Sequence, residues 1–395
     1  MPDSTRRRGL GRGHVACQQV RPTKGLEVAG MRLRRGERRL LLIPFAPGIG
    51  DVVMMEPLLR AVCQRLPDWE VTMVARPSAL ELLRPGGYRL ATPSYFVTEP
   101  PAPLRPLDGV VPRRVIAWCA GPGMAALLGP FERVINLFWI WESRVPFDRW
   151  WTPQWPPLEE VRHTVDLLAD YLEGELGSSI PARERVPRLE PFPDAVAWAR
   201  SYLRSSGAGR RPMVSMVVAA ANPLKWWSVS GWSGLNDSLQ AMGFETVMIA
   251  PRDHPHAMEV YRSCRARPLW PHIELKQVSA LLAQSRLVVG IDTGPLHMAA
   301  ALGVPWVGLF GASNPGLIGP YDGDGGVALV ARFSRPESCA RCWLSFKNRE
   351  RPCSTLPLTG CTASIPYADV IRAVESTLEG TSFASRPAPR SRDRR

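Results

Sequence analysis

The stretch IDTGPLHMAAALGVPWVGLFG, residues 291–311, brings an acid, a hydroxyl, a glycine and a proline to one corner. An apolar run ends at Asp292, and Thr293, Gly294 and Pro295 then open a helix of small residues. A helix N-terminus offers unpaired N–H groups to a phosphate, and glycine and proline there let it approach. Asp292 would repel a phosphate in direct contact and suits neutral sugar hydroxyls better. The corner therefore predicts adjoining diphosphate and sugar subsites.

His297 lies in the same expected helix, four residues after Thr293. Its ring nitrogens can donate to a phosphate, which would make it a ligand residue. A histidine on a small-residue helix can equally be a packed interior residue, and position alone favours packing slightly. Both interpretations stay open from the sequence.

A second acid follows the first apolar run, in PGIGDVVMMEPLLRAV, residues 47–62. Gly48 and Gly50 allow a tight turn, and Asp51 stands where a helix would begin. An aspartate there is often a helix N-cap that contributes about 1 kcal/mol. The same carboxylate, projecting into a cleft, could take the proton from an attacking hydroxyl. The residues alone leave the cap and the general base as alternatives.

Lys225 lies in ANPLKWWSVSGWSGL, residues 221–235, directly after another apolar run. A compact ammonium at the edge of a sheet suits a diphosphate leaving group, because it neutralises the charge that develops there. A solvated surface lysine is the alternative. Trp227 and Trp232 are expected to pack against the following helix rather than stack on a base.

Four cysteines follow the last apolar run with the spacing C-x₂-C-x₁₀-C-x₇-C: Cys339, Cys342, Cys353 and Cys361. Four thiolates at such spacing could close a tetrahedral zinc site. The irregular gaps leave disulfides and free packed thiols as alternatives. The run Asp322-Gly323-Asp324 resembles a metal-binding DxD motif, but it sits among glycines and is expected to form a turn.

The elements that must position these residues follow an alternating pattern of strands and helices. In the first half, apolar or alternating runs predict strands at 39–45, 70–75 and 133–138, with a helix over 51–66. A helix and a linker are expected within 180–211. In the second half, the expected strands are 212–220, 244–250, 286–292 and 306–311. The helices expected between and after them are 231–242, 257–266, 275–285 and 294–302. Buried strands separated by helices predict parallel sheets covered on both faces, with ligand at the strands' carboxyl ends.

The net charge of +13 on 395 residues is concentrated at the two ends of the chain. Residues 1–39 carry +8 and residues 380–395 carry +4, which leaves +1 for everything between. A nearly neutral core argues against nucleic-acid binding. Such Arg-rich ends are expected to be solvated and disordered, with contact to an anionic inner-membrane surface as the alternative.

No apolar segment in residues 9–30 could serve as a secretory signal, and no apolar run is long enough to span a bilayer. A cytoplasmic location with reduced cysteines is therefore expected. Five of the fourteen tryptophans lie within residues 139–157. That segment could form a lip facing an acceptor or a membrane, or a packed connection punctuated by prolines.

Three blocks together resemble the signature blocks of glycosyltransferase family 9, the ADP-heptose:lipopolysaccharide heptosyltransferase family. They are GIGDVVMMEPLLRAV, LKWW followed by GW, and DTGPLHMAAALGVPWVGLFGASNPGLIGP. Their order and spacing are kept over about residues 38–375, and the third block is the most specific. The strand VINLFWIW departs from the family, because Asn136 and Phe138 stand where an Asp and a Gln are common. The departure lies in the acceptor half of the chain.

The resemblance implies an α/β protein of the GT-B fold, in which two Rossmann-like, doubly wound domains face a cleft. The domains are expected at 38–195 for the acceptor and 196–375 for the nucleotide-sugar donor, between basic tails at 1–37 and 376–395. Asp51 matches the family's general base, Lys225 its donor-phosphate lysine, and Asp292 the acid that holds the heptose hydroxyls. Thr293, Gly294, Pro295 and His297 fall in the donor diphosphate region.

The function implied is inverting, metal-independent transfer of a heptose from ADP-heptose to a hydroxyl of a glycan or glycolipid acceptor, as in lipopolysaccharide core biosynthesis. No cofactor is required, the ADP-sugar is the donor substrate, and nucleic acid is not a partner. Transfer to a protein or a secondary metabolite is one alternative. A nucleotide-sugar epimerase of the same architecture is another, and a non-catalytic nucleotide-sugar binder is disfavoured because all three charged residues are present.

Overall fold

The structure is a computed structural model of the 395-residue chain. It describes residues 38–44, 48–74, 79, 82–83, 89–91, 133–137, 162–208, 211–311, 313–321, 325–331 and 361–380. The basic tail at 1–37, the Trp-rich segment at 139–157 and the Asp322–Asp324 turn lie outside these residues.

The first unit is built on a four-stranded parallel sheet with the order β3-β2-β1-β4. Its strands are β1 (Arg38–Ile43), β2 (Trp69–Val74), β3 (Arg89–Ala91) and β4 (Arg133–Asn136). The chain leaves β1 through helix α1 (Ile49–Arg65) to reach β2 on one side, and β4 then pairs on the other side of β1. The strand order therefore reverses at β1, between β2 and β4.

The second unit is a five-stranded parallel sheet with the order β6-β5-β7-β8-β9. Its strands are β5 (Met213–Val217), β6 (Glu245–Ile249), β7 (Leu287–Ile291), β8 (Trp306–Phe310) and β9 (Gly326–Val330). Here β5 is followed by β6 on one side, and β7 pairs on the other. The order therefore reverses at β5, between β6 and β7.

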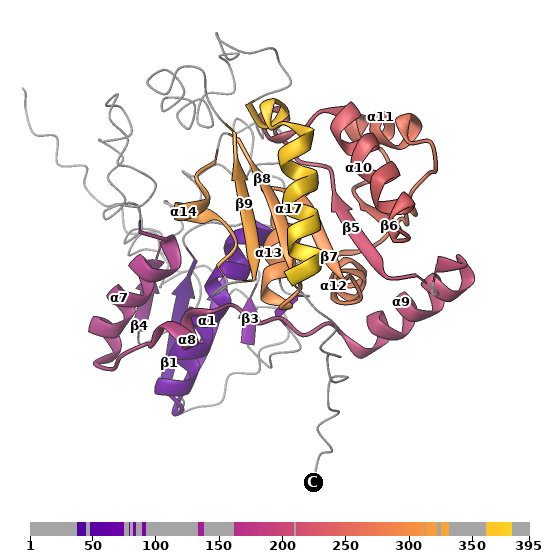
Figure 1. The fold of residues 1–395 in the computed structure, drawn as a ribbon. Coiled ribbons are helices and arrows are strands. Elements are labelled where there is room, and N and C mark those ends of the chain that lie inside the picture. The colour runs from indigo at the N-terminus through magenta and orange to yellow at the C-terminus, as the bar shows by residue number, and fades with distance from the viewer. Residues whose placement is uncertain are drawn as a thin grey trace, which may run out of the picture.

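Helices cover both faces of the second sheet (Figure 1). One face carries α10 (Val229–Ala241), α11 (Pro255–Ser263) and α17 (Tyr367–Gly380), and the other carries α12 (Leu275–Ala283) and α13 (Gly294–Ala301). The remaining described helices are α7 (Thr164–Leu176), α8 (Ala182–Arg185), α9 (Pro193–Ser205), α14 (Pro315–Ile318) and the 3₁₀ turns η5 (Pro223–Lys225) and η6 (Cys361–Ser364).

Successive side chains of a strand point to opposite faces, so each strand of the second sheet supplies two apolar clusters. Val214 and Met216 pack with α10, α11 and α17, and this cluster also buries Trp227 and Trp232. Met213 and Val217 belong to the other cluster, which continues without a break into the core of the first unit. The two units therefore share one apolar interior.

Helices α1 and α13 join the units, and a glycine in the first turn of each lets a side chain of the other helix pack directly on its backbone. A Cβ added at Gly294 would lie 2.7 Å from the Cβ of Ile49, and one added at Gly50 would lie 2.7 Å from Cδ2 of His297. Real Cβ atoms do not approach so closely, so both positions depend on glycine. The close packing brings the beginnings of the two helices to one place.

The expected strands and helices are confirmed within a few residues at their ends. The elements β3, β9, α7, α14 and α17 were not predicted from the sequence. The elements β3 and α14 have only three and four residues, too few for a periodic pattern, whereas α7 and α17 are helices of 13 and 14 residues that were missed. The structure places helices at two of the expected domain limits. The limit at 195/196 falls inside α9, and α17 continues to Gly380, five residues past the expected limit at 375, because its apolar face packs on β8 and β9.

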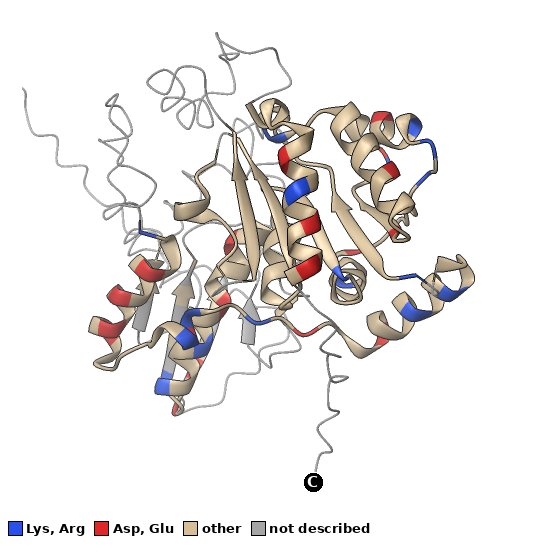
Figure 2. Cartoon of the chain, viewed as in Figure 1, with Lys and Arg blue, Asp and Glu red and all other residues tan. Residues whose placement is uncertain are grey.

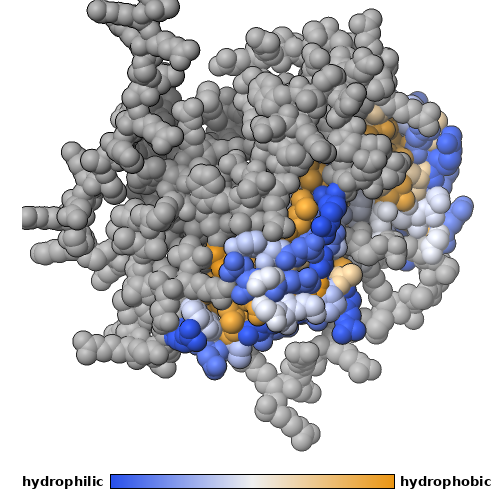
Figure 3. Space-filling model, turned by 90° about the vertical axis from the view of Figure 1, so that its left-hand side faces the viewer, coloured by the Kyte–Doolittle hydropathy of each residue, from blue (hydrophilic) through white to orange (hydrophobic). Residues whose placement is uncertain are grey.

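None of the helices among the described residues combines the length and the apolar character that a membrane crossing needs. On the side of the molecule drawn in Figure 3, hydrophilic residues make up most of the described surface, with small apolar areas between them.

Gly294→Ala should lower the free energy of unfolding by about 1–3 kcal/mol, because the new methyl group must displace Ile49 in a packed contact. Gly174→Ala is the matched control, since Gly174 is a helical residue with no atom within 4 Å of an added Cβ. The control should gain about 0.5–1 kcal/mol through helix propensity. Urea denaturation of both variants is the measurement, and equal values for the two would contradict the α1–α13 contact.

Candidate functional site

The candidate site lies where the strand order of both sheets reverses. In open parallel sheets such reversal points open a crevice at the carboxyl ends of the strands, and ligands bind there. Asp51 follows β1, Lys225 follows β5 and Asp292 follows β7. Helix α1 follows β1 and α13 follows β7, and the contact between these helices brings the reversal point of the first sheet next to that of the second.

Lys225 and Asp292 form an ion pair across the two central strands β5 and β7 (order in Figure 1). The Nζ of Lys225 lies 2.6 Å from Oδ2 of Asp292 and also donates to the backbone oxygen of Asp292, at 2.9 Å. The Asp292 side chain is 5% exposed and that of Lys225 is 16% exposed. Lys225 is therefore not a free surface lysine, and the pairing itself was not predicted from the sequence.

Burial by itself would raise the pKa of Asp292, but the positive charge of Lys225 and the nearby His297 outweigh it. Together they hold the pKa of this carboxyl below its ordinary value. Asp292 is therefore a carboxylate at any pH at which the protein works. The ammonium therefore compensates the buried charge of Asp292.

His297 is buried in α13 and faces the same carboxylate. Its Nε2 lies 3.6 Å from Oδ1 of Asp292, and its ring packs on Gly50 of α1. The Nδ1 atom is buried and has no hydrogen-bond partner among the described residues. His297 is thus a packed residue of the α1–α13 contact, and its role as a donor ligand stays a prediction.

Asp51 is not the N-cap of α1, which corrects one of the sequence interpretations. Gly48 takes the N-cap position, and Asp51 lies three residues on, with its Oδ2 accepting the N–H of Gly48 at 3.0 Å. Burial raises the pKa of Asp51, while His297, the Gly48 N–H and Lys225 lower it and Asp292 raises it further. The net direction is upward, which suits a group that must accept a proton.

Thr293, Gly294 and Pro295 form the first turn of α13, as expected. Thr293 is the N-cap, but its hydroxyl donates to the backbone oxygen of Ile291 at 3.2 Å instead of capping the helix. The first-turn N–H groups of α13 are therefore not covered by that side chain. An anion at this end would be favoured by these groups and by the helix dipole.

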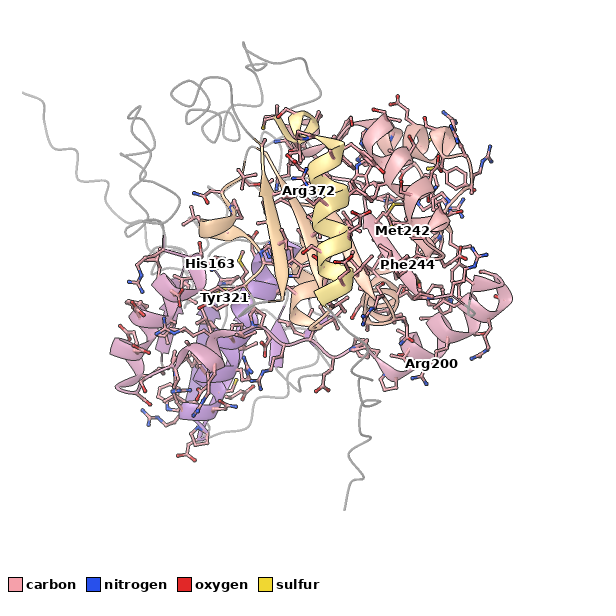
Figure 4. All side chains as sticks on the ribbon, viewed as in Figure 1. His163, Arg200, Met242, Phe244, Tyr321 and Arg372 are labelled. Carbon is pink, nitrogen blue, oxygen red and sulfur yellow. The ribbon has the colours of Figure 1, made fainter. Side chains whose placement is uncertain are left out.

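Sequence reasoning missed a contact between α7 and the segment that follows β8. His163 caps α7, since its Nδ1 accepts the N–H of Val165, and its Nε2 then donates to Gly319 O at 3.0 Å. Burial lowers the pKa of His163 to about 4, so the ring is neutral. Tyr321 lies beside it (Figure 4). The centroids of the two rings are 4.7 Å apart. A lone histidine before a helix gave no signal for this contact.

The same helix carries the main charge cluster of the first unit. Arg185 of α8 contacts three acids of α7, Asp166, Asp170 and Glu173, at 2.9–3.0 Å. Figure 2 shows the acidic residues along α7 beside basic residues of α8 and α1. Asp166 also accepts the hydroxyl of Tyr321 at 2.8 Å. The cluster ties α8 and the segment after β8 to α7 rather than forming a ligand site.

Of the four cysteines considered for zinc, the structure describes Cys361 alone; Cys339, Cys342 and Cys353 lie outside the described residues. The Cys361 side chain is buried against the turn that carries Lys225, with its Sγ 4.0 Å from the backbone oxygen of Leu224. Within the described part of the chain, no cluster of three or more His, Cys, Asp or Glu side chains could hold a metal ion. The zinc hypothesis therefore remains a prediction.

The fold and the paired crevices define a GT-B type of glycosyltransferase, and comparison with known proteins agrees. The family profile of glycosyltransferase family 9 (heptosyltransferase) matches residues 125–343, more than half of the chain. The chain belongs to this family, as its sequence motifs predicted.

Two curated relatives are lipopolysaccharide heptosyltransferases. Lipopolysaccharide heptosyltransferase 1 of Escherichia coli K12 is 31% identical over 180 residues, which cover 45% of this chain and 53% of the relative. The Salmonella typhimurium protein of the same name is 29% identical over 127 residues, 32% of this chain and 40% of the relative. The chain therefore spans about half or less of the length of these relatives.

Solved structures confirm the GT-B fold over most of the chain. A glycosyl transferase family 9 protein from Veillonella parvula has a TM-score of 0.61 at 20% identity, covering 87% of this chain and 98% of that structure. The E. coli heptosyltransferase WaaC with ADP has a TM-score of 0.53 at 19% identity, covering 86% and 99%. At these identities the likeness extends to the fold alone.

Lys225→Met should lower the free energy of unfolding at neutral pH by about 3 kcal/mol or more, because it leaves the Asp292 carboxylate buried without its cation. The loss should shrink as the pH falls, since an unpaired buried Asp292 has a raised pKa and takes up a proton.

The matched control for Lys225→Met is the double variant Lys225→Met/Asp292→Asn, which removes the buried charge as well and should recover much of the stability. Urea denaturation at pH 8 and pH 5 is the measurement. A single variant as stable as the wild-type protein would show that the pair carries no buried charge.

Proposed function

We propose that the protein transfers a heptose from ADP-heptose to a hydroxyl of a lipopolysaccharide-core-like glycan. Family membership supports heptose transfer, and the names of the curated relatives support the lipopolysaccharide acceptor. The observation that carries the proposal is the meeting of Asp51, from the first unit, with the Lys225–Asp292 pair and the first turn of α13, from the second.

In this proposal Asp51 is the general base. Its half-buried carboxyl has a raised pKa, so it can take the proton from the acceptor hydroxyl as that oxygen attacks the anomeric carbon. The bond from the anomeric carbon to the diphosphate oxygen breaks as the new bond forms. Attack from the face opposite the leaving group would invert the anomeric centre, which is the outcome we propose.

Lys225 and the N-terminal turn of α13 would receive the charge that develops on ADP. An ammonium and the positive end of a helix dipole at fixed positions stabilise a leaving diphosphate without reorganising during the reaction. Asp292, held as a carboxylate by Lys225, would accept hydrogen bonds from the sugar hydroxyls. Thr293, Gly294, Pro295 and His297 complete the proposed donor site.

We also propose that transfer needs no metal ion, with the ammonium and the helix end taking the place of a divalent cation at the diphosphate. One protein of similar fold, the glycosyltransferase TibC of enterotoxigenic E. coli, is described as iron-containing; it matches at a TM-score of 0.53 and 16% identity. A cytoplasmic location, with the basic ends of the chain beside an anionic membrane surface, completes the proposal.

Binding of ADP should raise the melting temperature, while UDP, GDP and CMP at equal concentration should leave it nearly unchanged. At one hundred times its Kd, ADP would add about 2.7 kcal/mol to the free energy of unfolding. The panel is measured with and without EDTA, and the ADP shift should be the same in both. A larger shift with UDP than with ADP would overturn the donor assignment.

Asp51→Asn should reduce kcat by about 10²–10⁴-fold and leave ADP binding almost unchanged, because the amide keeps the Gly48 hydrogen bond but cannot accept the proton. The wild-type kcat/KM should fall with decreasing pH through the raised pKa of Asp51, above the ordinary range of an aspartate, since the base acts only when deprotonated. If ADP binding and transfer are lost in parallel, Asp51 has a structural role at the N-terminus of α1 and is not the general base.

A further inference from the structure

The turn η5, which carries Lys225, contacts a segment that lies more than one hundred residues later in the sequence. The 3₁₀ turn η6 lies against η5, and Thr362 of η6 is fully buried. Its Oγ1 donates to the backbone oxygen of Leu224 at 3.1 Å. Leu224 immediately precedes Lys225, so this bond fixes the backbone from which the ammonium extends.

A second hydrogen bond holds the same turn on the other side of Lys225. The indole N–H of Trp227, a buried side chain, donates to the backbone oxygen of Ile365 at 2.8 Å. Residues 362 and 365 thus contact residues 224 and 227, and Lys225 lies between the two contacts. The residues 361–365 act as a brace for the turn.

The fit around the Thr362 side chain is close. A Cβ added at Gly311, just past the end of β8, would overlap the Thr362 hydroxyl and lie 2.5 Å from the Thr362 nitrogen. The hydroxyl therefore occupies a space that a glycine leaves open. A fully buried hydroxyl that donates to a backbone oxygen is suited to fix that oxygen in place.

We propose that Thr362 is a positioning residue for Lys225: its hydroxyl holds the Leu224 carbonyl so that the ammonium lies where it meets both Asp292 and the donor diphosphate. The inference rests on the proposed function, because it concerns the same diphosphate site. It adds a residue that touches neither substrate nor ion pair and acts through the backbone of η5. An ammonium displaced by a fraction of an ångström would lose much of its hydrogen-bond geometry.

Two substitutions separate the hydroxyl from the shape of the side chain. Thr362→Val keeps the volume and removes the donor, after which the Cys361 thiol, 4.0 Å from the same oxygen, is the remaining donor to Leu224 among the described residues. Thr362→Ser keeps the donor and removes a methyl group. A positioning role predicts that serine works and valine does not.

The first measurement is ADP affinity by calorimetry, well below the melting temperature of each variant. Thr362→Val should weaken ADP binding about five- to tenfold, the size of one lost hydrogen bond, and Thr362→Ser by less than about twofold. In the Lys225→Met background, Thr362→Val should cause less than about twofold further loss, because the residue acts through Lys225. Equal losses in both backgrounds would overturn the proposal, as would unchanged affinity in Thr362→Val.

Thr246→Val is the matched control for loss of a buried hydroxyl. Thr246 is equally buried in the same unit, and its Oγ1 donates to Asn236 Oδ1 at 2.7 Å, away from η5. This variant should lose stability and keep its ADP affinity. If it weakens ADP binding as much as Thr362→Val does, the effect is general destabilisation and the positioning role is wrong.

The second measurement, amide hydrogen exchange over residues 222–228, needs no nucleotide. Thr362→Val should speed exchange of the Lys225 and Trp226 amides, which are bonded to the backbone oxygens of Asn222 and Pro223, and Thr362→Ser should not. Unchanged exchange in Thr362→Val would overturn the positioning role. Failure of the wild-type protein to bind ADP would instead count against the proposed function, while this measurement still decides the role of Thr362.

Discussion

The ion pair between Lys225 and Asp292 is the interaction on which the site depends. A carboxylate this deeply buried is stable only beside a cation, and the cation comes from the neighbouring central strand. The pair therefore fixes the distance between the loops after β5 and β7. The positive charge of Lys225 also holds the pKa of Asp292 below its ordinary value, so that Asp292 stays ionised.

Close packing of α1 on α13 brings Asp51 of the first unit to the Lys225–Asp292 pair of the second unit. Gly50 and Gly294 let the first turns of α1 and α13 approach closely. Asp51 then lies near enough to His297, Lys225 and Asp292 for these residues to change its pKa. One buried apolar cluster includes residues of both units. The packing of this shared core therefore holds the two sheets in their relative positions. The proposed base and the proposed donor-binding groups thus come from different sheets, and they meet where two glycines let the helices approach closely.

Much of the fold could be predicted because hydrophobic periodicity is a local property. The strands at β5, β7 and β8 are uninterrupted apolar runs, and the helices between them repeat apolar residues at helical spacing. Short elements such as β3 and β9 lack enough residues for a pattern. The helix expected within 180–211 is α9, and its packing against α12 of the second unit is a tertiary contact that the local pattern does not contain.

The sequence by itself determined the residue types of the site, the turns that carry them and the family, because motifs of glycine, acid and helix start are local. Only the tertiary structure decided which groups meet. It paired Lys225 with Asp292 and placed Asp51 at the third residue of α1 instead of at its N-cap. It also brought Thr362 to the turn that carries Lys225, more than one hundred residues away in the chain. Such contacts follow from strand order and packing, which no single segment encodes.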